Sequence, residues 1–138
     1  MTQEDREILI KDLCARLPYG VKAEYYDPEA ERITCDEIYD VYSAKYINSV
    51  EVDIGQYCLP LTDVKPYLFP MSSMTEEQHK EYCSLVWFDG LSHGWNRDDA
   101  IILNEVEMLI DFYHKNHLDW RGLIPKGLAI DATGKNIY

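Results

Sequence analysis

The sequence is short of basic side chains and of long apolar runs, and each shortage excludes a class of protein. Lysine and arginine number 13 against 25 aspartate and glutamate residues, so the net charge is −12. Such a chain repels nucleic acid, whose binding depends on cationic side chains that neutralise phosphates. No apolar run approaches the roughly 20 residues of a membrane-spanning helix. We therefore expect neither direct nucleic-acid binding nor a membrane segment.

The sequence also lacks paired cysteines and a signal peptide. Cys14, Cys35, Cys58 and Cys83 form no C-x-x-C pair, and none is expected near a histidine with zinc-like spacing. The first five residues carry acids and no base, whereas the start of a signal peptide is basic. These features predict four reduced thiols in a cytoplasmic protein, mostly buried as small apolar side chains.

With 138 residues and 12% aromatic side chains, the chain fits one domain with a packed core. Residues 1–17 predict a helix, because their apolar side chains recur at a period of 3.6. Residues 21–64 change to a period of 2 in four short runs separated by tight turns, which predicts an antiparallel meander. A small half-open barrel is an open alternative for the same segment.

Two further helices are expected in residues 75–117. Thr75 and Gln78 match a capping box for the first helix. The second helix has the strongest apolar stripe in the chain, with Ile102, Val106, Leu109, Ile110 and Tyr113 on one face. Residues 118–138 form a glycine-containing tail. The sequence thus predicts a single α+β domain over 1–138, with an N-terminal helix, a four-stranded antiparallel meander and two C-terminal helices.

Three segments carry a resemblance to known proteins: 11–22 (KDLCARLPYGVK), 64–78 (VKPYLFPMSSMTEEQ) and 116–130 (NHLDWRGLIPKGLAI). They resemble a group of small uncharacterised proteins from phages and mobile elements of gut bacteria. The likeness covers about a third of the chain, and it brings no activity and no catalytic residues. It implies a bacterial cytoplasm and a phage–host setting, which favours a protein that binds and modulates a host component.

No residue set predicts a catalytic site or a cofactor. His93 shares a glycine-bearing loop with Asp89, and a histidine near a carboxylate can act as a general base; however, no nucleophile with a signature context accompanies them. Asp111 and His114 lie three residues apart on one helix face, which makes them a weak alternative metal pair. A hard-cation site that joins Asp98 or Asp99 to Glu51, Asp53 or Asp89 lacks a recognisable calcium loop.

Tyrosines among acids form the preferred candidate site. Tyrosine is enriched at protein interfaces, and four tyrosines fall in the acidic sheet region. The predicted partner-binding residues are Tyr26, Tyr39, Tyr42, Tyr46, Trp95, Asp98 and Asp99.

The pattern favours a non-enzymatic, acidic protein-interaction module. The phage–host setting favours a phage or mobile-element protein that modulates or inhibits a host protein. Its partner would have a basic surface, reached by electrostatic steering and held by aromatic anchors. Two alternatives stay open: a small metal-dependent or acid–base hydrolase, and a structural homo-oligomer without a ligand.

Overall fold

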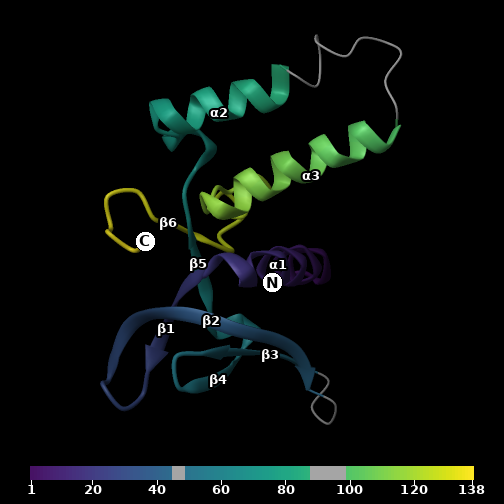
Figure 1. Ribbon diagram of the computed structural model, residues 1–138. Coiled ribbons are helices and arrows are strands. Elements are labelled where there is room, and N and C mark those ends of the chain that lie inside the picture. Colours follow the sequence, from purple (N-terminus) through teal and green to yellow (C-terminus); the bar gives the residue numbers. More distant parts are fainter. Residues whose placement is uncertain (45–48, 88–98) are drawn as a thin grey trace.

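The computed structural model describes residues 1–44, 49–87 and 99–138. Figure 1 shows a curled sheet at one end of the molecule, the helix pair α2–α3 at the other end, and α1 between them. The elements in chain order are α1 (Gln3–Arg16), η1 (Leu17–Tyr19), β1 (Lys22–Asp27), β2 (Arg32–Ala44), β3 (Ser49–Ile54), β4 (Tyr57–Pro60), η2 (Leu61–Asp63), β5 (Lys65–Leu68), η3 (Met71–Ser73), α2 (Glu76–Trp87), α3 (Asp99–Lys115) and β6 (Ile130–Asp131).

The α+β class and the N-terminal helix are as predicted, but the sheet is larger than a four-stranded meander. Strands β1 to β4 pair antiparallel with their chain neighbours, and the full strand order is β4-β3-β2-β1-β5-β6. β5 lies just beyond residues 21–64, where the four strands are predicted, and it pairs antiparallel with β1 over two residue pairs. β6 joins β5 in parallel, so the sheet is mixed. Pro66 within β5 has no N–H to donate, which explains why this short pairing leaves no strand pattern in the sequence.

A short connection forces the sheet to curl. In a flat sheet, four spacings of about 4.8 Å would separate β4 from β5. Only η2 and Val64 join the two strands, and a 3₁₀ turn advances about 2 Å per residue. The curl brings Tyr57 of β4 to Tyr25 of β1, with ring centroids 5.8 Å apart, and the Tyr57 hydroxyl donates to Asp27 at 2.8 Å. Among the described residues the order ends at β4 and β6, so the curl does not close into a barrel.

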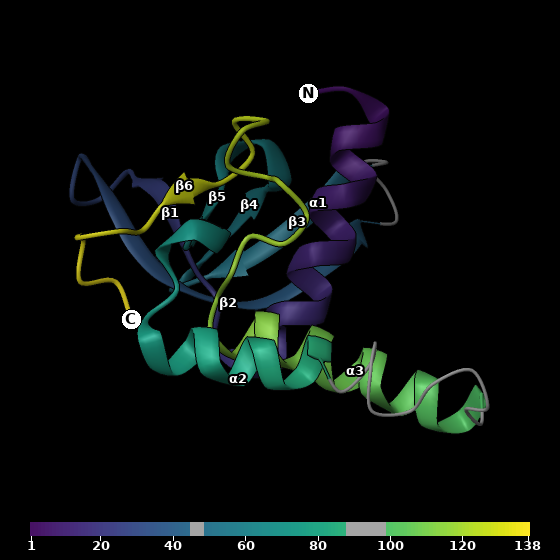
Figure 2. The same ribbon diagram turned by 90° about the horizontal axis from the view of Figure 1, so that it is seen from above.

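Helix α1 covers the concave face of this sheet, as Figure 2 shows from above. The helix begins after Thr2, whose hydroxyl accepts the Asp5 N–H at 3.0 Å and so caps it. Leu9 and Leu13 project into the core, where burial of each side chain contributes roughly 1.5–3 kcal/mol. The buried core comprises Leu9, Leu13, Val21, Ala23, Tyr25, Ile38, Val52, Ile54, Leu61, Val64, Leu68, Leu123, Leu128 and Ala129.

A buried ion pair joins α1 to the chain that follows α3. Arg16 and Asp12 are both fully buried, with Arg16 Nε 2.6 Å from Asp12 Oδ2. Arg16 Nη2 also donates to the Leu118 carbonyl at 2.7 Å. The second Asp12 oxygen lies 3.3 Å from Arg121 Nε, close enough for an ion pair but without hydrogen-bond geometry. The i,i+4 spacing alone predicts a helical pair worth a few tenths of a kcal/mol, but the burial of both charges ties this pair to the rest of the fold.

The predicted tail is packed against the sheet. Phe69 donates its N–H to the His117 carbonyl at 2.9 Å and accepts the Asp119 N–H at 2.8 Å, which extends the β5 pairing. The Asp119 carboxylate accepts the N–H groups of Leu123 and Ile124 at 2.7 and 2.9 Å. These bonds explain why a segment with three glycines holds one conformation.

Tyr138 completes the junction between β1 and β5. Its hydroxyl accepts the Lys22 N–H at 3.0 Å and donates to the Tyr67 carbonyl at 2.7 Å. Its ring stacks on His117, with centroids 3.6 Å apart. One side chain therefore fills a gap in the ladder and holds the end of the described chain against the sheet.

Helices α2 and α3 pack through aromatic side chains. Tyr82 of α2 lies 6.3 Å, between centroids, from both Phe112 and Tyr113 of α3. The predicted capping box is confirmed: Gln78 N–H donates to the Thr75 hydroxyl at 3.2 Å, and Thr75 N–H donates to the Gln78 amide oxygen at 2.9 Å. None of the helices in the described ranges is long and apolar enough to cross a membrane.

Replacing Arg16 tests the buried ion pair. Arg16→Met leaves the buried Asp12 carboxylate without its hydrogen-bonded partner and with only the contact to Arg121, so we expect the free energy of unfolding to fall by about 3–5 kcal/mol. Lys11→Ala, an exposed cation on the same helix, is the control and should change it by less than about 0.5 kcal/mol. Urea unfolding measures both variants, and equal small effects would contradict the structural role of Arg16.

The half-buried side chain of His117 makes the fold sensitive to acid. Burial, followed by Arg16 and Lys22, lowers the pKa of His117 to about 4. An unfolded histidine titrates near 6.5, so below that pH the unfolded chain binds a proton that the folded chain refuses. Stability is therefore lost as the pH falls from about 6.5 towards 4.

The variant His117→Asn isolates this contribution, because asparagine tolerates the left-handed backbone at this position, where φ is 54°. Thermal unfolding at pH 7 and pH 5 should show a smaller acid-induced loss of Tm in the variant than in the wild type. An unchanged difference between the two pH values would contradict the assignment.

Candidate interaction surface

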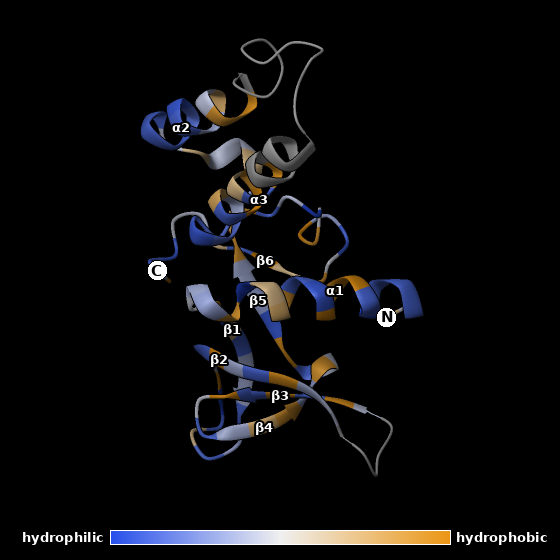
Figure 3. Ribbon diagram, turned by 45° about the vertical axis from the view of Figure 1, so that its right-hand side comes forward, coloured by the Kyte–Doolittle hydropathy of each residue, from blue (hydrophilic) through white to orange (hydrophobic). Residues whose placement is uncertain are grey.

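The strands present one face away from α1 and the core. On β1, Ala23 and Tyr25 are buried, so Lys22, Glu24 and Tyr26 point to the other side. The pairing register continues this face across the sheet, and Figure 3 shows hydrophilic and hydrophobic residues interspersed along these strands. We call it the outer sheet face; it comprises Lys22, Glu24, Tyr26, Ile33, Cys35, Glu37, Tyr39, Asp40, Tyr42, Ser49, Glu51, Asp53, Cys58, Pro60, Lys65 and Tyr67.

Three of the predicted tyrosines lie on this face. Tyr26 is 57% exposed and lies directly opposite Ile33, which is 64% exposed. Tyr39 is 61% exposed because the register shifts between Ile38 and Asp40, and such a bulge turns two successive side chains outward. Tyr42, three residues further along β2, is also exposed. Large apolar surface left in water on neighbouring strands marks an interaction site better than isolated exposed residues do.

The other predicted partner-binding residues are not placed on this face. Tyr46, Trp95 and Asp98 lie outside the described residues. Asp99 begins α3, and its side chain is outside the described part of the structure.

Carboxylates dominate the outer sheet face. Two lysines, Lys22 and Lys65, accompany five acids, and the Lys22 ammonium already donates to the Ile137 carbonyl at 3.0 Å. Asp40 stands directly opposite Asp53, and like charges in such a cross-strand pair are destabilising. The ion pairs that join described residues all lie elsewhere, on α1, α2, α3 and the chain after α3. The acids are Glu24, Glu37, Asp40, Glu51 and Asp53.

Tyr42 lies at the centre of the most acidic part of this face. Its hydroxyl is 3.0 Å from Cys58 Sγ and donates to Asp53 at 3.4 Å. The hydrogen bond with the Cys58 thiol, followed by desolvation and the Asp53 charge, raises the pKa of Tyr42 above its ordinary value. The phenol therefore stays protonated at neutral pH and adds no charge to the face.

Cys58 and Glu51 were not predicted to share a surface with Tyr42. The signal was present, because alternation in residues 50–54 and the turn at Gly55 fix which side chains share a face. Cys58 and Cys14 are exposed and the other two cysteines are partly buried, so the expectation of mostly buried thiols was wrong.

A shallow hollow of about 190 Å³ opens beside Tyr26 and Ile33, bounded by Asp63 and Lys65. Small-molecule sites measure about 300–1,000 Å³, so this hollow suits a single side chain of a partner. Glu24 also lines the hollow, and its carboxylate accepts the Tyr67 hydroxyl at 2.7 Å. Burial, followed by this bond, raises the pKa of Tyr67, which keeps it a donor.

The weak metal pair has other partners. His114 is buried, and its Nε2 accepts the Trp120 indole N–H at 3.2 Å. Asp111 accepts the Tyr19 hydroxyl at 2.8 Å. Within the described ranges no three histidine, cysteine, aspartate or glutamate side chains gather where they could hold a metal ion. His93 and Asp89 lie outside the described residues.

No protein-family profile, curated protein or solved structure matches this chain. Function must therefore be argued from the surface itself.

If the exposed rings serve binding, they contribute little to folding. The double substitution Tyr26→Ser and Tyr39→Ser should change the free energy of unfolding by less than about 1 kcal/mol, since surface changes are usually within about 0.5 kcal/mol each. Tyr25→Ser, a buried neighbour on β1, should cost about 3–5 kcal/mol. Urea unfolding compares them, and similar losses would show that the outer rings are structural.

Proposed function

We propose that this protein is an acidic protein-interaction module, which binds a partner with a basic surface through the outer sheet face. One observation carries the proposal: exposed tyrosines share one face of the sheet with carboxylates that form no ion pair with another described residue. The resemblance of three segments to proteins of phages and mobile elements supports the setting. In that setting the protein acts in a bacterial cytoplasm and modulates or inhibits a host protein.

Binding proceeds in two physical steps. The net charge of −12 attracts a cationic surface and speeds the encounter. Tyr26, Ile33 and Tyr39 then lose water against the partner, and such central anchors supply most of the affinity of an interface. The opposed pair Asp40 and Asp53 supports the choice of a basic partner, because a cation placed between them removes their repulsion.

The hydrolase alternative gains no support from the described residues, since Asp111 and His114 are held by Tyr19 and Trp120. His93 and Asp89, the other candidates for that alternative, lie outside the described residues, so the proposal rests on the outer sheet face.

Affinity capture from bacterial lysate with paired charge variants tests the proposal. Bait carrying Glu51→Gln and Asp53→Asn loses two charges on the outer sheet face. Bait carrying Glu76→Gln and Glu77→Gln loses two charges on α2 and is the matched control. We expect one partner to be captured at about 50 mM salt, to be lost at about 500 mM salt where charges are screened, and to be lost with the sheet variant only.

Tyr26→Ser with Tyr39→Ser should also weaken binding of that partner by at least about 30-fold, as expected for loss of a hot spot. Equal losses with the α2 control, or capture that is indifferent to salt and to both sheet variants, would overturn the proposal. Recovery of no partner by folded wild-type bait at low salt would count against it as well.

A further inference from the structure

Helix α2 carries a histidine and a cysteine one turn apart. Cys83 Sγ lies 3.6 Å from His79 Nδ1. This pair was missed in the sequence, where no cysteine was expected near a histidine, although side chains at i and i+4 share a helix face. The pair is separate from the outer sheet face, at the opposite end of the molecule (Figure 1).

The separation of the two atoms fits one particular ligand. Zinc binds cysteine sulfur at about 2.3 Å and histidine nitrogen at about 2.0–2.1 Å in tetrahedral geometry. Two such bonds at about 109° place sulfur and nitrogen about 3.6 Å apart, which is the distance in the structure. A zinc ion can therefore bridge the two atoms with little movement of either side chain.

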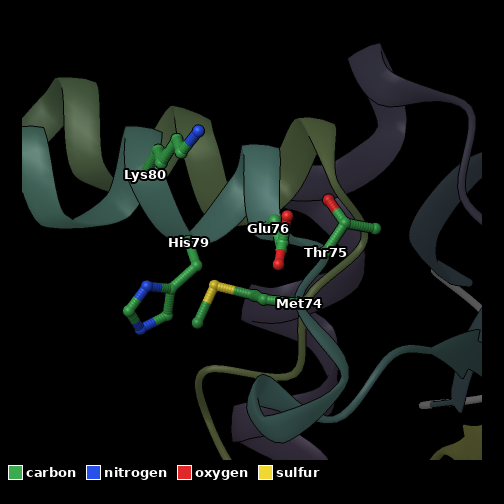
Figure 4. A pocket seen from close by; sticks show the side chains of 5 residues that line it. All are labelled: Met74, Thr75, Glu76, His79 and Lys80. Atoms are coloured by element: carbon green, nitrogen blue, oxygen red, sulfur yellow. The ribbon is translucent and has the colours of Figure 1, made fainter.

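The pair lies at the side of the contact between α2 and α3. Tyr82 faces Phe112 of α3, and the His79 ring lies 6.3 Å, between centroids, from Tyr82. His79, Cys83 and Val86 follow a stripe of their own at i, i+4 and i+7. His79 and Val86 are exposed, and Cys83 is partly so. Beside His79 is an open hollow of about 550 Å³, into which Met74 and His79 extend (Figure 4). This flank of α2 is open to another molecule.

The donor set on one chain is half of what zinc requires. Structural zinc sites are four-coordinate, and two cysteines with two histidines are a common set. Within the described residues no third histidine, cysteine or carboxylate joins His79 and Cys83. A twofold axis beside α2 would bring the same two residues from a second copy, because a twofold interface uses one patch twice.

We propose that two copies of this chain share one zinc ion, each contributing His79 Nδ1 and Cys83 Sγ. Each cysteine thiol releases its proton to solvent on binding, so that two thiolates and two neutral imidazoles surround the ion. The exposed Val86 of each copy, one turn beyond Cys83, adds apolar contact beside the site. The proposal is independent of the partner-binding function of the outer sheet face.

Sedimentation of the full chain in a phosphine reductant, with and without zinc, tests the proposal. The reductant prevents a Cys83 disulfide from linking two copies. We expect a monomer without metal, and a doubling of mass on addition of half an equivalent of zinc per chain. Cobalt should give the same stoichiometry, with a thiolate-to-cobalt absorption band and tetrahedral visible bands.

Both signals should be lost in Cys83→Ser and in His79→Gln, and circular dichroism would confirm that each variant is folded. Cys58→Ser removes an exposed cysteine whose contacts among the described residues are Tyr42 and Glu51, and it should retain both signals. A monomer at saturating zinc, binding of one metal per chain, or equal loss of binding in Cys58→Ser would overturn the proposal. A dimer that forms without metal and survives His79→Gln would overturn it too.

Discussion

The buried Arg16 guanidinium is the constraint on which the arrangement of this molecule depends. It bonds Asp12 within α1 and the Leu118 carbonyl after α3, and Asp12 in turn approaches Arg121. Buried charges remain tolerable only while they are paired, so these segments must stay together once the pair is desolvated. The same guanidinium lowers the pKa of His117, although less than burial does, and that ring stacks on Tyr138. The helix, the end of α3 and the tail are thereby fixed as one unit over the concave face of the sheet.

That unit determines which surface is left for partners. Because α1 and the tail cover the concave face, the convex face of β1 to β4 keeps its side chains in water. Two lysines of this face stand opposite acids, Lys22 opposite Glu37 and Lys65 opposite Glu24, but the rings of Tyr26 and Tyr39 stay exposed and Asp40 stands opposite Asp53. Exposed rings and a like-charge pair that the fold does not require are the physical basis for assigning this face to binding.

Local patterns predicted local structure well, and long-range contacts escaped them. Alternation in β1 to β4, the Thr2 cap and the Thr75 capping box could be found from neighbours in the sequence, as could the exposed tyrosines of the sheet. Arg16 and Leu118 are 102 positions apart, so nothing near Arg16 in the sequence indicates that its charge is buried. β5 escaped because Pro66 interrupts its pattern and two residue pairs suffice to hold it. The i,i+4 spacing of His79 and Cys83 was sufficient to predict that the two side chains are neighbours, although the pair was not predicted.

The central claim is that acidity and exposed rings on the outer sheet face form one binding surface, distinct from the acidic helix α2. Nuclear magnetic resonance of the labelled protein during titration with a short arginine-rich peptide tests this most directly. The account predicts that shifted amides concentrate at Tyr26, Ile33, Tyr42 and Asp53, and that shifts diminish as salt screens the charges. Shifts of equal size along Glu76, Glu77 and Glu81 of α2 would show that the peptide follows net charge alone, and would contradict the account.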